Sequence, residues 1–296
     1  MRSAIETWLL SLPDIHIEIV LVDDGSSDHS FELCSEWAQS NPIVKLIGFS
    51  RNFGHQSAVS AGLCYATGEA VVIIDADLQD PLDVIPKMIQ SYEEGYDVVY
   101  GQRTLRRGET LFKRGSAWIF YRLMRWGVHK NLPVDTGDFR LVSRKCVDAI
   151  NAMPESHRFL RGMFAWVGFS QQAVLYERKE RLYGDTNYPL RKMLRFAWQG
   201  ITSFSTLPIQ LVSITGFCIA AIGIAVCLYA VISWLRGDVV PGWTSLMGWT
   251  AFLGGMVLCS LGIIGEYIGK IYEEVKHRPL YIIRRTVNCP QSHHVE

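Results

Sequence analysis

The order of apolar and polar residues divides the chain into two regions. In roughly the first two thirds of the chain, charged residues occur throughout. Two long apolar runs follow: residues 208–235, without a charge, and residues 243–269, with the single acid Glu266. Each run exceeds the roughly 20 apolar residues that cross a lipid bilayer. The pattern predicts two transmembrane helices within residues 207–270, because a helix of a soluble core seldom stays uncharged over such a length.

Within the first region, short β-branched runs alternate with helical patterns. We expect strands at residues 17–22, 44–49, 70–75 and 97–101, and helices from Ser27 or Asp28 to about Gln39, over 55–66 and over 81–94. Strands that are separated by helices in this way form βαβ units around a parallel sheet. Residues 1–188 are thus predicted to form an α/β domain with a mostly parallel sheet flanked by helices.

Polar residues collect where these predicted strands end. They are Asp23, Asp24, Arg51, Asn52, Asp75, Asp77, Gln79 and Arg103. In a parallel sheet all of these ends lie at one edge, which is where such folds bind their ligands. The neighbouring residues Ser26, Ser27 and Asp28 have a simpler explanation, since their side chains are typical caps of the helix that follows.

Asp75 and Asp77 indicate a metal site. If they continue the strand, both side chains point to the same face, roughly 6.5 to 7 Å apart. Two carboxylates at this separation repel one another unless a cation lies between them, and a divalent ion is the common solution. We therefore expect the two acids to share a divalent cation.

Charge and composition narrow the choice of partners. Residues 102–145 contain eleven Lys and Arg against three acids, which suggests an anionic second substrate, with phosphate the natural candidate. Within this stretch, a predicted Gly-Asp turn places Asp138 and Arg140 two residues apart, before another strand. The formal net charge is zero, so nucleic acid is not an expected partner. The seven cysteines form no closely spaced pair, as is usual in a reducing cytoplasm.

The charges that flank the apolar runs predict the orientation in the membrane. Basic residues precede the first run and follow the second, whereas the link between them carries only Arg236 against Asp238. Both ends of the chain should then lie in the cytoplasm, with two crossings of the inner (plasma) membrane. We expect residues 189–206 to form a basic amphipathic helix at the membrane surface and residues 271–296 a cytoplasmic tail. Glycines in the second run allow close helix packing and favour a homo-oligomer.

Taken in order, the motifs of the chain resemble those of the family-2 inverting glycosyltransferases of the GT-A fold. Among these, they are most similar to the membrane-anchored polyprenyl-phosphate sugar transferases, namely the bactoprenol glucosyltransferases and, more distantly, the dolichol-phosphate mannose synthases. The motifs are VDDGSSD (22–28), FSRNFGHQSAVSAGL (49–63), DADLQDP (75–81), GDFRL (137–141), ERLYGDTNY (180–188) and GITSFSTLP (200–208). With the two apolar runs, the resemblance covers nearly the whole chain.

The resemblance implies a site for a nucleotide-sugar donor. Asp23 and Asp24 would contact the uracil and the ribose of the nucleotide, and Arg51 and Asn52 would border its base. Members of these families normally begin with an extra strand whose end closes the nucleotide pocket, whereas Met1 opens directly into a helical pattern here. We expect that the chain starts downstream of the usual beginning; otherwise the pocket lacks one wall.

The resemblance also implies a metal and a set of catalytic residues. Mg²⁺ or Mn²⁺ would bridge the donor diphosphate, held by Asp75, Asp77 and Gln79, and Asp75 would also border the nucleotide. Asp138 stands where the bactoprenol enzymes have a catalytic acid. Three arginines would serve the charges of the acceptor or of the diphosphate: Arg103, Arg140 and Arg181.

These features predict an inverting transfer of a hexose, by default glucose, from a UDP-sugar to undecaprenyl phosphate or a similar polyprenyl phosphate at the cytoplasmic membrane face. The product would serve modification of O-antigen or of another cell-envelope glycan. A phosphate monoester is already ionised near neutral pH, so Asp138 either removes a remaining proton or orients Arg140.

Three alternatives compete with this prediction. The donor could be GDP-mannose or an amino-arabinose nucleotide, or the protein could be a nucleotide-sugar-binding scaffold, without turnover, for a partner flippase. A processive polysaccharide synthase is disfavoured, because RLMRW (122–126) lacks the Gln of a Gln-x-x-Arg-Trp motif and two spans are too few for an export channel.

Overall fold

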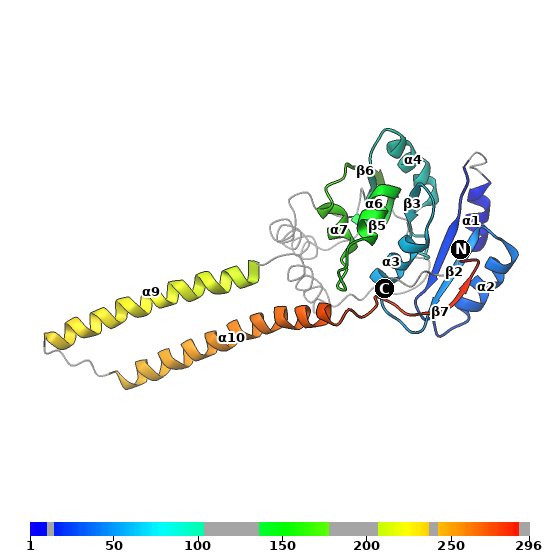
Figure 1. Ribbon diagram of the computed structural model, residues 1–296. Coiled ribbons are helices and arrows are strands. Elements are labelled where there is room, and N and C mark those ends of the chain that lie inside the picture. The colour runs from blue at the N-terminus through cyan, green and yellow to red at the C-terminus, as the bar shows by residue number, and fades with distance from the viewer. Residues whose placement is uncertain (11–14, 104–135, 178–206, 237–241, 290–296) are drawn as a thin grey trace. The chain divides into compact units, whose positions relative to one another are not determined.

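The computed structural model in Figure 1 describes residues 1–10, 15–103, 136–177, 207–236 and 242–289. The chain forms two compact units. The first consists of residues 1–189 together with 278–296, and the second of residues 190–277. The predicted basic helix at 189–206 and the predicted site residue Arg181 lie outside the described residues.

The first unit contains a three-stranded sheet. Its strands are β1 (Ile19–Asp23), β2 (Val44–Phe49) and β7 (Ile283–Val287), in the order β1-β2-β7. β1 and β2 are parallel, as predicted, whereas β7 runs antiparallel to β2. The helices of this part of the chain are α1 (Arg2–Leu9) and α2 (Ser30–Ser40). Trp37 of α2 is buried against Val44 and Leu46 of β2, and this apolar contact holds the helix on the sheet.

A second sheet of four strands completes the first unit. Its strands, in spatial order, are β3 (Ala70–Ile73), β5 (Thr136–Ser143), β4 (Val98–Arg103) and β6 (Gln171–Tyr176). β5 is antiparallel to both of its neighbours, and β4 is parallel to β6. The α/β fold class is confirmed, but the sheets are mixed rather than mostly parallel. The expected turn at Gly137 and Asp138 is wrong, because both residues lie inside β5.

Further helices of the first unit pack on the first sheet as well as on the second, and the sequence predicts those over 55–66 and 81–94. The further helices are α3 (His55–Tyr65), the short 3₁₀ helix η1 (Leu82–Val84), α4 (Ile85–Glu93), α6 (Arg144–Asn151) and α7 (Leu160–Trp166). Met88 of α4 packs into a core with Phe139 of β5 and Tyr176 of β6. Tyr176 of this core also donates a hydrogen bond to Asp80, in the loop that follows β3. The core therefore supports the loop that carries the predicted metal ligands.

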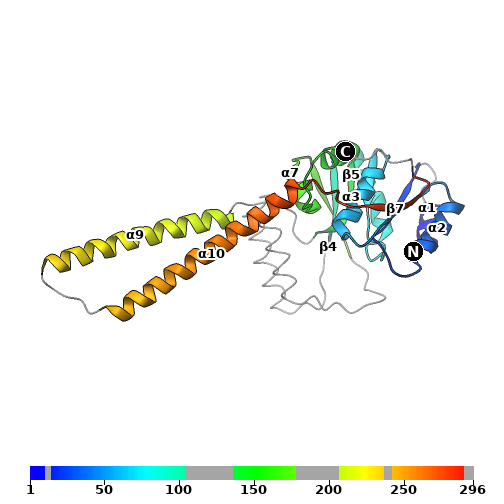
Figure 2. The same cartoon turned by 60° about the horizontal axis from the view of Figure 1, so that its bottom comes forward.

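The second unit holds the two predicted apolar helices, α9 (Leu207–Leu235) and α10 (Trp243–Val275). They run alongside each other in Figures 1 and 2. Both are long and apolar enough to cross a membrane, over Pro208–Val226 and Phe252–Val275. Their apolar side chains, such as Phe217, are exposed, which is not expected of the core helices of a soluble domain.

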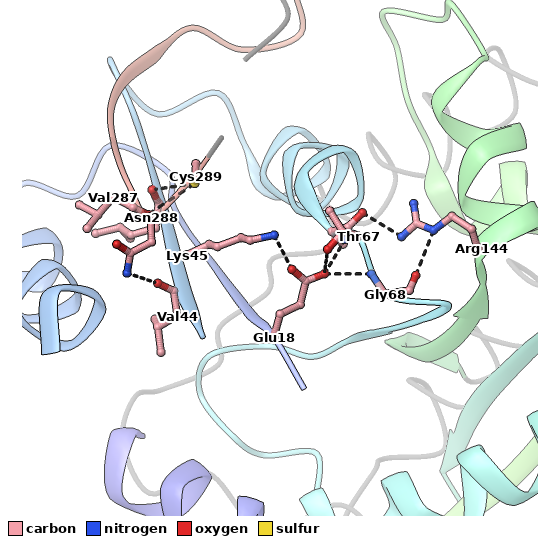
Figure 3. A network of polar contacts seen from close by, with 11 residues as sticks. Glu18, Val44, Lys45, Thr67, Gly68, Arg144, Val287, Asn288 and Cys289 are labelled. Atoms are coloured by element: carbon pink, nitrogen blue, oxygen red, sulfur yellow. Dashed lines mark hydrogen bonds and ion pairs between the residues drawn. The ribbon is translucent and has the colours of Figure 1, made fainter. Parts of the chain in front are cut away.

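After α10 the chain returns to the first unit. Residues 271–296, predicted as a cytoplasmic C-terminal tail, include the end of α10 at Val275 and the strand β7, which joins the first sheet. Asn288 anchors the end of this strand, because its Nδ2 donates a hydrogen bond of 3.0 Å to the carbonyl oxygen of Val44 (Figure 3). The segment that follows the second span is therefore part of the first unit.

Glu18 ties the two sheets together just before β1. Its Oε1 accepts hydrogen bonds from the backbone nitrogens of Thr67 and Gly68, at 2.5 and 3.0 Å, and its Oε2 pairs with Lys45 (Figure 3). Arg144 completes the link, since its Nε donates to the carbonyl oxygen of Gly68 at 3.0 Å. Burial raises the pKa of Glu18, but the hydrogen bonds from Lys45, Thr67 and Gly68 outweigh it and lower the pKa below its usual value.

We predict that Glu18→Gln destabilises the protein near neutral pH by about 1 to 3 kcal/mol, because a charged acceptor of several hydrogen bonds is replaced by a neutral one. The pKa of Glu18 is lower in the folded state, so this stabilisation is present above the unfolded pKa and is lost as the pH falls through the folded value. Thermal unfolding in detergent should therefore show a difference between wild type and variant that shrinks toward acid pH. Glu6→Gln, which removes an exposed ion pair with Arg2, is the control and should change little. Equal losses in the two variants would contradict the prediction.

Candidate functional site

The contacts of His55 show that loops from both sheets meet at one edge of the first unit. His55 opens α3 after β2, and its Nε2 lies 3.0 Å from Oδ2 of Asp138 and 3.8 Å from Oδ1 of Asp75. β5 runs antiparallel to β3, with Ile73 opposite Arg140, so the beginning of β5 lies at the carboxyl end of β3. Asp75 and Asp138 therefore share one rim, although they are far apart in the sequence.

Asp24 joins the loops that follow β1 and β2. Its Oδ1 accepts a hydrogen bond of 2.7 Å from the backbone nitrogen of Phe53, and its Oδ2 accepts one of 2.9 Å from that of Gly54. Gly25 allows this close approach, because a Cβ there would lie 2.4 Å from the carbonyl carbon of Arg51, and its φ is 70°. Asp24, which we expected to contact the nucleotide, thus holds the second loop in position.

The other residues predicted to bind the nucleotide lie on these same two loops. The carboxylate of Asp23 accepts a hydrogen bond of 3.3 Å from the backbone nitrogen of Ser26, which closes the first loop. The guanidinium of exposed Arg51 lies 3.9 Å from the centroid of the Phe53 ring and donates to the carbonyl oxygen of Asn52 at 3.0 Å. We call residues 51–54 the Arg51 loop. The structure thus brings the four predicted nucleotide-binding residues of the first sheet together.

Asp75 and Asp77 lie on a turn and not on an extended strand. β3 ends at Ile73, and the carbonyl oxygen of Asp75 accepts a hydrogen bond of 3.2 Å from the backbone nitrogen of Leu78, whose φ is 50°. Oδ1 of Asp77 accepts one of 3.0 Å from the backbone nitrogen of Gln79. The expected strand alternation of the two acids is therefore wrong, because this turn sets their positions.

A buried acid fixes the end of the same turn. Asp80 is 1% exposed, and its Oδ1 accepts a hydrogen bond from the hydroxyl of Tyr176 in β6. Gln79, the third predicted metal ligand, is also buried at the base of the turn. Backbone and buried contacts therefore hold this turn, while Asp77 remains exposed at its outer side.

The electrostatics of Asp75 suit a cation. Burial raises the pKa of Asp75, and the carboxylates of Asp138, Asp80 and Asp77 raise it further, whereas His55 lowers it. No group of three or more His, Cys, Asp or Glu side chains that could hold a metal occurs among the described residues. Two carboxylates without a full cage suit Mg²⁺ or Mn²⁺, which then complete their coordination with water and phosphate oxygens. The residues present fit a metal that binds together with a diphosphate.

Asp138 lies at the centre of a compact charged cluster. Arg161 of α7 binds its carboxylate with two hydrogen bonds, from Nε at 2.8 Å and from Nη2 at 3.0 Å, and His55 adds the contact described above. Burial raises the pKa of Asp138, but the hydrogen bonds from His55 and Arg161 hold it far below its usual range. An ionised carboxylate only accepts hydrogen bonds, so Nε2 of His55 carries a proton that it donates to Asp138. That same bond raises the pKa of His55, which partial burial opposes.

Arg140 supports this cluster from inside the domain. It is 4% exposed, its Nη2 donates to the carbonyl oxygen of Gly137 at 3.1 Å, and its guanidinium lies 4.6 Å from the centroid of the Phe164 ring. Burial lowers the pKa of Arg140 to about 10, so it remains charged at neutral pH beside Asp138. Arg140, which we expected to serve the charges of the acceptor or of the diphosphate, is thus a buried positive charge beside Asp138.

Several residues of the site escaped the sequence analysis. His55 adjoins the Arg51 loop, and that adjacency was a signal that could have identified it. Arg161 had no such signal, since it lies on a short helix whose beginning is fixed by a hydrogen bond of 2.9 Å from the backbone nitrogen of Leu160 to Oε1 of Gln56 in α3. Arg103 is the last residue of β4, but the predicted role of its side chain lies outside what the structure describes.

Comparison with known proteins agrees with this geometry. The family model described as glycosyl transferase family 2 matches residues 2–150. This range contains both Asp75 and Asp138. An uncharacterised glycosyltransferase of Bacillus subtilis (strain 168), YkcC, is 48% identical over 270 residues, 91% of this chain and 84% of that protein.

Two relatives carry more specific names. The prophage bactoprenol glucosyl transferase homolog of Escherichia coli (strain K12) is 39% identical over 93% of this chain and 90% of its own length. The bactoprenol glucosyl transferase of Shigella phage SfII is 40% identical over 93% of this chain and 89% of its own length. With its family model, its relatives and its rim of strand-end acids, the chain belongs to glycosyl transferase family 2.

Proposed function

We propose that this protein transfers a hexose, by default glucose, from a UDP-sugar to a polyprenyl phosphate such as undecaprenyl phosphate, with inversion, at the cytoplasmic face of the inner membrane. The observation that carries the proposal is the likeness to the bactoprenol glucosyl transferases, which extends over more than nine tenths of the chain and includes both apolar helices. The glycosylated lipid would serve modification of O-antigen or of another cell-envelope glycan.

The donor would bind on the two loops joined by Asp24. Asp23, Arg51 and Asn52 line these loops and would contact the nucleotide, while Asp24 keeps the loops together. Asp75 and Asp77 would hold Mg²⁺ or Mn²⁺, with Gln79 as the further predicted ligand. When bound, this metal would neutralise charge on the diphosphate of the donor.

Asp138 would orient its neighbours and not take a proton. The acceptor is a phosphate monoester, whose second pKa is about 6, so it is already a competent nucleophile at neutral pH. The low pKa of Asp138 and its hydrogen bonds to Arg161 and His55 make it a poor base. Its carboxylate would instead fix the side chains of Arg161 and His55 at the rim where donor and acceptor meet.

The fold supports two membrane crossings. Residues 1–189 and 278–296 belong to one unit, in which β7 pairs with β2. A strand cannot pair with another through a bilayer, so this pairing supports a topology in which both flanks of the two apolar helices lie on the same side of the membrane. The basic flanks favour the cytoplasmic side. A homo-oligomer and a partner flippase remain predictions.

The proposal is tested with membranes that contain the protein. They are incubated with undecaprenyl phosphate and, separately, with labelled UDP-glucose, GDP-mannose or an amino-arabinose nucleotide, with and without a chelator. We expect label from UDP-glucose in the organic phase, and its loss when the chelator is present. Donor binding without any labelled lipid would favour the alternative function of a nucleotide-sugar-binding scaffold.

We predict that Asp77→Asn lowers transfer by at least about 100-fold, because the loss of one of two carboxylates weakens the hold on the metal. The stability should be almost unchanged, because the side chain at position 77 is exposed. The asparagine also keeps an oxygen that can accept the hydrogen bond from the backbone nitrogen of Gln79. Initial rates and thermal unfolding are measured on the same preparation. Asp83→Asn, an exposed acid in η1, is the matched control. Near-normal rates in Asp77→Asn would remove Asp77 from the site.

A second prediction tests the role of Asp138 as an orienting group. Arg161→Lys keeps the positive charge but cannot form the paired hydrogen bonds to Asp138, so kcat should fall by about 10- to 100-fold, while the KM for the donor changes little. Steady-state kinetics at saturating acceptor separate the two constants. An unchanged kcat would show that charge alone is sufficient and would contradict this role.

A further inference from the structure

The segment that follows α10 contacts the donor side of the site. The ring of Tyr281 stacks on Phe49 at the end of β2, with 4.9 Å between the ring centroids and 12° between the ring planes. The backbone nitrogen of Ser50 donates a hydrogen bond of 2.9 Å to the carbonyl oxygen of Ile282. The residues that lead into the Arg51 loop are thus held by a part of the chain that comes after both apolar helices.

An aromatic contact connects Phe49 with Phe53, which lies in the Arg51 loop. Phe49 meets Phe53 edge-to-face, with ring centroids 5.8 Å apart and an interplanar angle of 88°. The backbone nitrogen of Phe53 binds Asp24, and its ring lies under the guanidinium of Arg51. The position of Phe53 therefore determines where two of the predicted donor-binding groups lie.

Tyr281 is itself fixed in place. Ile283, two residues on, is paired with Phe49 across the antiparallel β7–β2 ladder, and Asn288 anchors the far end of this strand on Val44. This backbone pairing fixes the place of the Tyr281 ring, and a ring held in this way can transmit a definite position to its neighbour, whereas a loosely packed ring cannot.

We propose that Tyr281 is a positioning residue for the nucleotide-sugar donor, which sets the Arg51 loop through Phe49 and Phe53. This inference rests on the proposed function, since it assumes that the donor binds on that loop. It has a consequence for how the enzyme becomes active. The donor site is complete only after α9 and α10 have been made and the chain has returned to the first sheet, so donor binding is coupled to the formation of the membrane hairpin.

The experiment compares Tyr281→Ala, Tyr281→Phe and Tyr281→Leu in the complete 296-residue chain in detergent or nanodiscs. Ile282→Ala is the matched control, because this neighbouring side chain is 53% exposed. For each protein we would measure the Kd for UDP by calorimetry in the presence of Mg²⁺, the KM for UDP-sugar, kcat and the unfolding temperature.

We expect Tyr281→Ala and Tyr281→Leu to weaken UDP binding and to raise the donor KM by about 10-fold, in line with the loss of an aromatic pair. The kcat at saturating donor should stay within about 3-fold of wild type, because the groups around Asp138 are untouched. Tyr281→Phe keeps the ring and should restore donor affinity, and Ile282→Ala should match wild type. A residue that only stabilised the fold would lower the unfolding temperature without this split between KM and kcat.

The outcomes separate the inference from the proposed function. Wild-type UDP affinity in Tyr281→Leu, or a fall in kcat at unchanged donor KM, would overturn the positioning role. Tyr281→Leu retains an apolar side chain of similar reach, so it decides the question if Tyr281→Ala fails to fold. If wild type binds UDP without transferring sugar and Tyr281→Leu binds it more weakly, the positioning role stands and the transferase function fails. A wild-type chain that does not bind UDP at all would overturn both.

Discussion

A carboxylate that is almost buried has to be balanced by positive charge, and the site depends on how this is done at Asp138. Three basic side chains from different elements surround it: His55 from α3, Arg140 from β5 and Arg161 from α7. The cluster therefore joins the two sheets and the short helix α7 at a single point. Because the charges of these groups are largely satisfied by one another, they can be held at the rim without a substrate.

Among the residues that the structure describes, the same rim also gathers negative charge around Asp75. Asp75 is partly buried beside three other carboxylates, which raise its pKa together with burial, whereas His55 lowers it. A neutral protein with such a local excess is suited to a divalent cation, and a cation at that point is suited to a diphosphate. Among the described residues, Asp138 has close hydrogen bonds from Arg161 and His55, whereas Asp75 has only the longer contact with His55; under the proposed function, the first would orient groups and the second would help to receive the donor.

The second organising feature is the return of the chain to the first sheet after the two apolar helices. β7 pairs with β2, Asn288 anchors the strand and Tyr281 stacks on Phe49. The two apolar helices are thus inserted between two parts of one folded unit, and do not follow its end.

Local patterns in the sequence were sufficient to predict many of the helices and strands and to identify the candidate acids of the site. Apolar length without charge identified α9 and α10, the polar strand ends identified Asp75 and Asp77, and the GDFRL motif identified Asp138, because each signal lies within one short segment. The sequence could not show which strands β5 and β7 pair with, since the pairing and direction of strands are decided by packing between distant segments. For the same reason the tertiary structure alone revealed that Arg161, 23 residues from Asp138, is its partner, that Arg140 is buried, and that Tyr281 lies against Phe49. Residue types can show that charges need partners, but only the fold determines which side chains come within hydrogen-bonding distance.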